Sequence, residues 1–186
     1  MNYNKEPFPD DIIVLIQKCD AVIVKIKESF SDQECLIVKD LYHTDKGHKQ
    51  KDFIQKLQVI CNNKLNDKSK KLDEVKGLYI FGELNNIGKV EAIYVGISRT
   101  VIRRLYQHTW GKMHNETTFS YLKAKHFSQH TGKRIDLAEE LLKEQQEKIK
   151  NYRLLVFPEI NDYDLYFMEV YIAGKLKTKW NSFKTH

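Results

Sequence analysis

The pattern of apolar and polar positions changes character near residue 75. Before that point, apolar residues recur at helical spacing from about residue 11 to residue 30 and again over 53–65, which predicts a mainly helical N-terminal region. The β-branched run 22–26 would also suit a strand, and periodicity alone leaves both structures open. Residues 66–74 contain almost no apolar side chain, as is typical of a solvated connector, so a boundary is predicted near residue 75.

Two β-rich runs follow this boundary. Residues 77–84 (GLYIFGEL) and 90–97 (VEAIYVGI) are separated by 85–89, where Asn and Gly supply the positive backbone angles of a hairpin turn. A third strand is predicted for the short apolar run 154–157, which ends before Pro158. The second half of the chain therefore contains a small sheet that begins with an antiparallel hairpin.

Helical patterns surround these strands. A helix capped by Ser98 or Thr100 follows the second strand, and longer helices are predicted over 136–150 and 162–177. The expected fold class is α/β, more narrowly α+β: a short central antiparallel or mixed three-stranded sheet flanked by helices, preceded by the helical region 1–75.

The positive charge of the chain is confined to the part after residue 75. Residues 1–75 hold 13 Lys, 13 acidic residues and no Arg, so the whole formal charge of +6 and every arginine lie in 76–186. Arginine suits bidentate phosphate contacts, so this distribution favours a polyanionic partner. No apolar run approaches the roughly 18–20 residues that cross a bilayer. The 3 cysteines are scattered without CxxC spacing, which favours buried thiols in a reducing cytoplasm over disulfides or a zinc site.

Several polar residues in this second part are candidates for chemistry, although each is weak evidence alone. Tyr79 and Tyr94 lie on the predicted strands, where tyrosines commonly serve packing. Arg104 and His108 share one helical face at i,i+4 spacing. Glu169 lies in a helix segment that is apolar nearly all round, where a carboxylate is costly to bury unless it is paired, hydrogen-bonded or bound to a metal ion.

Taken together, these residues resemble one family. The order GLY, then YVG, then Arg and His on the next helix, then a helix Glu and an Asn twelve residues later (Asn181) is similar to the GIY-YIG nuclease superfamily. The resemblance covers about residues 76–183 and is clearest over 94–108. Leu78 replaces the usual Ile of the first motif. The insert at about 109–151 and residues 1–75 have no counterpart in the family core.

The resemblance implies hydrolysis of a DNA phosphodiester by water. Tyr79 would take the proton of the water or orient that water, which requires a lowered phenol pKa or transfer of the proton onward. His108 could accept that proton if it lies within reach. Arg104 would bind the non-bridging phosphate oxygens. Arg103 competes for this role, but only Arg104 is one helical turn from His108.

The resemblance also implies a divalent ion, usually Mg²⁺, with Mn²⁺ as a substitute. Glu169 would hold the ion, which as a Lewis acid stabilises the leaving group. One carboxylate is few for magnesium, but this ion commonly keeps several waters and takes substrate phosphate oxygens as ligands. Tyr94 would orient the phosphate or the water, and Asn181 would brace the site or touch DNA.

Basic residues near the motifs are the candidate DNA contacts. A phosphate backbone attracts clustered Lys and Arg side chains, although such residues also form ordinary solvated faces. The candidates are Arg99, Arg103, Lys112, Lys123 and Lys125.

The leading interpretation is a restriction or genome-defence endonuclease, because the chain is short and shows no long linker or separate DNA-binding module. A structure-specific repair or recombination nuclease is the runner-up. A non-catalytic nucleic-acid-binding module on a degenerate nuclease fold is the alternative from another class, although a binder has no need of the metal carboxylate Glu169. One active site must act twice or dimerise to break both strands, so a homodimer would suit the activity.

Overall fold

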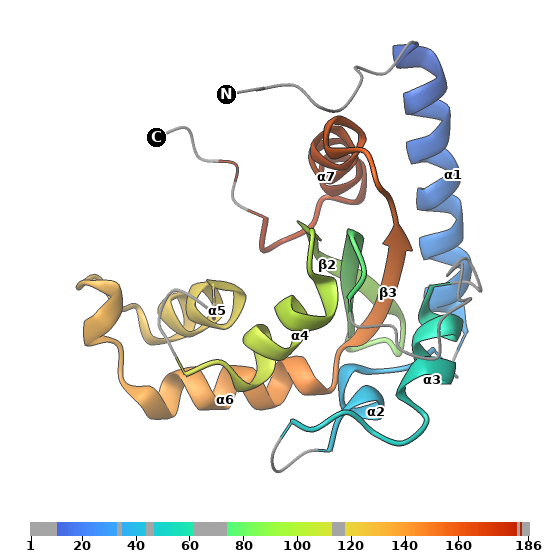
Figure 1. Cartoon of the computed structure of the whole chain (residues 1–186). Coiled ribbons are helices and arrows are strands. Elements are labelled where there is room, and N and C mark those ends of the chain that lie inside the picture. Colours follow the sequence, from blue (N-terminus) through green and yellow to red (C-terminus); the bar gives the residue numbers. More distant parts are fainter. Residues whose placement is uncertain are drawn as a thin grey trace, which may run out of the picture.

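An antiparallel sheet of three strands forms the centre of the computed structural model (Figure 1). The strands are β1 (Gly77–Leu84), β2 (Val90–Ser98) and β3 (Arg153–Pro158), in the order β2-β1-β3. Both pairings are antiparallel, which confirms the predicted hairpin and third strand and narrows the sheet to the purely antiparallel form. The structure describes residues 11–32, 35–43, 47–61, 74–112, 118–181 and 183.

The β1–β2 hairpin owes its geometry to its turn and to one irregularity. In the turn, the Asn85 side chain accepts hydrogen bonds from the backbone N–H groups of Ile87 and Lys89, at 3.0 and 2.9 Å, and Gly88 has a φ of 78°. Such an angle is strained for residues with a Cβ. The register shifts between Phe81 and Gly82, which changes the twist of the strands next to Tyr94.

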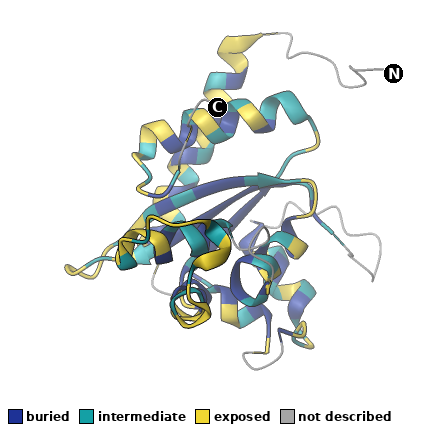
Figure 2. Ribbon diagram, turned by 90° about the vertical axis from the view of Figure 1, so that its left-hand side faces the viewer, coloured by how far each residue is buried: buried dark blue, intermediate teal, exposed yellow. Residues whose placement is uncertain are grey.

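Helices α1 (Ile12–Ser31) and α7 (Asp162–Leu176) cover one face of the sheet. Their apolar sides pack on Leu78, Ile80 and Val95 of the strands. The run 22–26 lies within α1, so helical burial against the sheet decides between the two structures that its β-branched residues allowed. Figure 2 shows the strands as a mostly buried layer between helices whose outer sides are exposed.

The other helices cover the opposite face of the sheet (Figure 1). The N-terminal helices contribute to both layers, because Val38, Leu57 and Ile60 share a core with Tyr79 and Phe81. Among the described residues, each of the two hydrophobic cores therefore contains side chains from before and from after the boundary predicted near residue 75. No helix in the described ranges is long and apolar enough to cross a membrane. The elements on this face are α2 (Val38–Leu41), α3 (Phe53–Ile60), α4 (Val101–Trp110), α5 (Thr118–Ser128), the 3₁₀ turn η1 (Arg134–Asp136) and α6 (Glu139–Lys150).

The cap of helix α4 differs from the prediction. Thr100 occupies the N-cap position but makes no side-chain cap hydrogen bond. Instead, the Glu74 carboxylate accepts from the backbone N–H groups of Ile102 at 2.6 Å and Arg103 at 3.2 Å. A carboxylate at a helix N-terminus also interacts favourably with the helix dipole. The predicted N-cap position at Thr100 is confirmed, but the side chain that caps the helix belongs to Glu74, a residue distant in sequence.

Candidate active site

The centre of the candidate site is a buried hydrogen bond between the first motif and helix α4. The Tyr79 side chain from β1 and the His108 side chain from α4 are 1% and 0% exposed, and Tyr79 Oη lies 2.9 Å from His108 Nε2. Burial, together with the positive charge of Arg104, holds the pKa of His108 well below its usual value. The imidazole is therefore neutral, and one of its nitrogens is free of a proton. The predicted condition that His108 lies within reach of Tyr79 is met.

Gly96 makes room for the Tyr79 phenol. Gly96 on β2 is the register partner of Tyr79, and the Tyr79 ring lies directly over it. A Cβ atom at position 96 would approach Tyr79 Cζ to 2.4 Å and Oη to 2.5 Å, well inside van der Waals contact. Glycine is therefore required at position 96 because the Tyr79 side chain lies so close to it, and not because of an unusual φ angle.

Tyr94 from β2 completes the aromatic wall of the site. Its ring centroid lies 6.1 Å from that of Tyr79 and 5.9 Å from that of His108. Phe119 of α5 stacks on the Tyr94 ring at 4.4 Å with an interplanar angle of 18°. Phe119 was not singled out in the sequence, because its spacing in the insert is that of any core aromatic residue.

Arg104, rather than Arg103, belongs to this cluster. Burial raises the pKa of the Tyr79 phenol well above its usual value, Tyr94 adds to the rise, and the charge and hydrogen bond of Arg104 oppose it. Burial likewise raises the pKa of Tyr94, against the opposing charge of Arg104. Arg103 is exposed on α4. A lowered Tyr79 pKa, one of the two predicted conditions for proton transfer, is contradicted because the buried phenol stays protonated.

Glu169 reaches the cluster from helix α7. This helix packs against the edge strand β2, and the Glu169 carboxylate is close enough to Tyr94 to raise the pKa of that phenol. The Glu169 side chain is partly buried, and desolvation raises its own pKa from 4.5 to about 7. No hydrogen bond or ion pair joins Glu169 to another described residue. A half-buried carboxylate without a counter-charge is a suitable ligand for a divalent cation, which would supply the missing positive charge.

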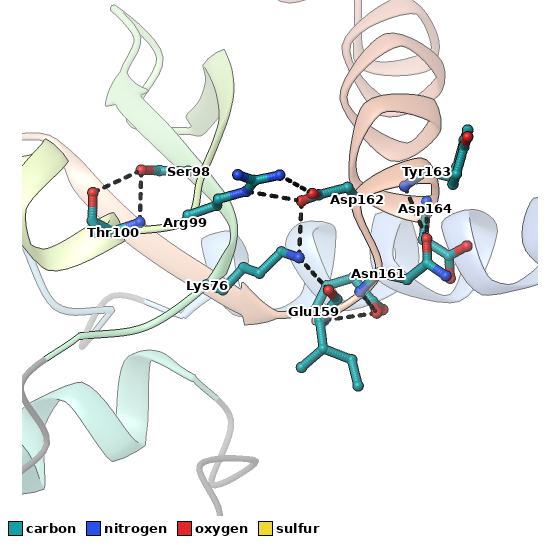
Figure 3. Close-up of polar contacts among 10 residues, drawn as sticks. Lys76, Ser98, Arg99, Thr100, Glu159, Asn161, Asp162, Tyr163 and Asp164 are labelled. Atoms are coloured by element: carbon teal, nitrogen blue, oxygen red, sulfur yellow. Dashed lines mark hydrogen bonds and ion pairs between the residues drawn. The ribbon is translucent and has the colours of Figure 1, made fainter. Parts of the chain in front are cut away.

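Ion pairs at the start of α7 hold the helix that carries Glu169. Arg99 and Lys76 both bind the Asp162 carboxylate, with Lys76 Nζ 2.8 Å from Oδ1 (Figure 3). The Arg99 hydrogen bond, followed by that of Lys76, lowers the pKa of Asp162 to about 2. Glu169 lies seven positions after Asp162 and hence about two turns along the same face of the helix. Arg99, predicted to contact DNA, already has a carboxylate partner with which a phosphate would compete.

Asn181 supports the strand that carries Tyr94. Its Nδ2 donates to the Val95 carbonyl at 2.7 Å, and its Oδ1 accepts from the Val95 N–H at 2.9 Å and from the Thr178 hydroxyl at 2.8 Å. The backbone N–H of Trp180 donates to the Ile93 carbonyl at 3.0 Å. The C-terminal turn thus pairs with the outer edge of β2. Of the two roles expected for Asn181, these contacts are those of a brace.

The predicted DNA-contacting lysines do not form one surface. Lys112 and Lys125 are exposed, but Lys123 is only 2% exposed. Its Nζ hydrogen-bonds the Tyr152 hydroxyl and lies 4.8 Å from the centroid of the Trp180 ring. The prediction that Lys123 follows a phosphate backbone was wrong, because Lys123 lies on the buried side of α5 among aromatic rings, and burial lowers its pKa to about 8.

Known proteins give no independent indication of the role of this site. No family model, no curated protein and no solved structure matches the chain. Among the described residues there is also no group of three or more His, Cys, Asp or Glu side chains arranged to hold a metal ion. A metal ion at Glu169 would therefore complete its coordination with water and substrate oxygens.

Proposed function

We propose that this protein is a divalent-metal-dependent DNA endonuclease of the GIY-YIG type. The observation that carries the proposal is the convergence of five side chains from four separate elements in one cluster: His108, Tyr94 and Arg104 lie against the buried Tyr79 phenol, and Glu169 lies near Tyr94. Elements distant in sequence bring together two tyrosines, a histidine, an arginine and a carboxylate, which is the set of groups that phosphodiester hydrolysis requires. The five residues are Tyr79, Tyr94, Arg104, His108 and Glu169.

The proton of the attacking water would pass through Tyr79 to His108. The raised pKa of Tyr79 argues against a resting phenolate as the base. With Oη and Nε2 2.9 Å apart, the phenol can accept the proton of the water while it gives its own proton to the neutral imidazole. The lowered pKa of His108 keeps the imidazole neutral before the reaction, and the relay would use the tautomer that carries its proton on Nδ1 and leaves Nε2 free to accept. This relay needs no stable phenolate, so burial of the phenol is compatible with catalysis.

Arg104 and Glu169 would act on the phosphate. The guanidinium of Arg104 is fixed beside both tyrosines, where it can donate to the non-bridging oxygens as negative charge develops. The Glu169 carboxylate would hold Mg²⁺, or Mn²⁺ in its place, and the bound ion would stabilise the leaving oxygen as a Lewis acid. Tyr94 is partly exposed, and both Arg104 and Glu169 lie near its phenol. Its hydroxyl would orient the phosphate.

Plasmid cleavage tests this function directly. Wild-type protein with Mg²⁺ is expected to nick or linearise supercoiled DNA, EDTA to stop the reaction, and Glu169→Gln to abolish it. Tyr79→Phe should lower the rate by about 10²- to 10⁴-fold, because the proton relay is lost. Glu140→Gln, which removes an exposed carboxylate on α6, is the matched control and should cleave normally. The proposal fails if the wild-type protein cuts no form of DNA with Mg²⁺ or Mn²⁺.

The cleavage products also identify the kind of nuclease. Discrete bands with defined ends would support a restriction or genome-defence enzyme, our leading proposal, with a homodimer as the form that cuts both strands. Cutting confined to branched or flapped DNA would favour a structure-specific repair or recombination nuclease. Tight DNA binding without cleavage, unchanged in Glu169→Gln, would indicate a non-catalytic binding module.

A further inference from the structure

Arg134 has buried hydrogen-bond donors without acceptors. It lies in the 3₁₀ turn η1 of the insert, and its guanidinium carbon is 4.4 Å from the centroid of the Tyr121 ring on α5. Its Nε and Nη2 atoms are buried and have no hydrogen-bond partner among the described residues. Buried guanidinium donors are costly to leave unpaired, and Arg134 as a whole is only partly buried, so its side chain is suited to an anionic acceptor that arrives from outside the chain.

A second positive charge lies near this guanidinium. Burial lowers the pKa of Arg134, the Tyr121 ring opposes that change, and repulsion from Arg104 lowers the pKa further. No salt bridge joins Arg134 to a carboxylate in the described part of the chain. Arg104 and Arg134 repel each other, and no described carboxylate pairs with Arg134. The two side chains therefore create a region of positive potential, and an anion bound beside them would reduce their repulsion.

We propose that Arg134 is a second phosphate-binding residue of the candidate site, which acts with Arg104 on the phosphate groups of the substrate. The planar fork of an arginine matches phosphate oxygens with two parallel hydrogen bonds. Stacking on Tyr121 fixes the plane of that fork before the substrate arrives, which reduces the entropy lost on binding. The insert thereby contributes a group to the site whose other members belong to the strands and to α4 and α7. The inference rests on the proposed function for the identity of the substrate.

Inorganic phosphate is a probe that separates this inference from nuclease activity. Phosphate binding would be measured by isothermal titration calorimetry at constant ionic strength, without a divalent metal, for the wild-type protein and its variants. Arg134→Gln should weaken phosphate binding by about tenfold or more, the effect expected for loss of a charge-assisted hydrogen-bonding pair. Arg134→Lys keeps the charge but loses the fork, so intermediate affinity is expected. Lys133→Gln removes one exposed charge from the adjacent residue and should bind as the wild type does.

A double-mutant cycle shows whether the two arginines share the anion. The combined loss in Arg104→Gln with Arg134→Gln should be clearly smaller than the product of the two single losses. Wild-type protein without saturable phosphate binding, or Arg134→Gln with wild-type affinity and a normal melting curve, would overturn the inference. Loss of phosphate binding in Arg134→Gln, combined with no DNA cleavage by the wild type, would uphold the anion site and refute the nuclease.

Discussion

Replacement of Glu169 by Gln should stabilise the protein at alkaline pH and remove a pH dependence that the wild type shows. The folded pKa of Glu169, about 7, lies above its ordinary value of 4.5 because of burial. For such a group, the contribution to stability is fully present below about pH 4.5 and is lost as the pH rises through about 7. The neutral amide of Gln avoids this loss, because nothing at position 169 then has to ionise.

The size of the effect follows from the shift. A rise from 4.5 to about 7 corresponds to about 3.4 kcal/mol at about 1.36 kcal/mol per pKa unit. Because the side chain is only partly buried, solvent screening reduces this to about 1–2 kcal/mol. The free energies of unfolding of the two proteins should therefore be close near pH 4.5, and the Gln variant should be more stable by about 1–2 kcal/mol near pH 8.

Urea denaturation at a series of pH values measures this difference, and the other titrating groups cancel when the two curves are subtracted. Mg²⁺ at about ten times its Kd should then stabilise the wild type near pH 8 by about 1.4 kcal/mol and leave Glu169→Gln unchanged. Parallel pH curves for the two proteins would refute the burial argument. Equal stabilisation of both proteins by Mg²⁺ would refute Glu169 as the ligand.

Two further predictions use matched pairs of substitutions. Gly96→Ala should lower the free energy of unfolding by about 1–3 kcal/mol, because the new methyl group overlaps the Tyr79 ring, whereas Gly174→Ala meets nothing within 4 Å on α7 and should stabilise the helix by about 0.5–1 kcal/mol. Equal effects in a urea titration would show that the close approach at position 96 is not tight. In a cleavage-deficient background, Lys125→Met should weaken DNA binding and reduce its salt slope by about 0.9, while the buried Lys123→Met should leave that slope unchanged. A reduced slope in the Lys123 variant would contradict its burial.

Local signals in the sequence were sufficient to predict the three strands and the helices that end near residues 150 and 177. Alternation and turn chemistry identified the 77–84 and 90–97 hairpin, because a hairpin depends only on neighbouring residues and on the turn between them. The choice of Arg104 over Arg103 also followed from local geometry, since one helical turn places Arg104 on the face of His108. The relative placement of Arg104 and His108 depends only on the period of a single helix, and the sequence is enough to give that period.

Tertiary structure decided the features that depend on distant segments. The α4 cap is Glu74, the exposed-looking Lys123 is enclosed by aromatic rings, and the unpaired Arg134 comes to lie near Arg104. Burial also excluded a lowered Tyr79 pKa, one of the two conditions that the sequence left open, because desolvation by the surrounding core outweighs the nearby arginine. Residue type and spacing thus determined which groups are available for chemistry. Their ionisation and their partners were determined only by packing, because the local dielectric and the neighbouring charges come from elements far apart in the chain.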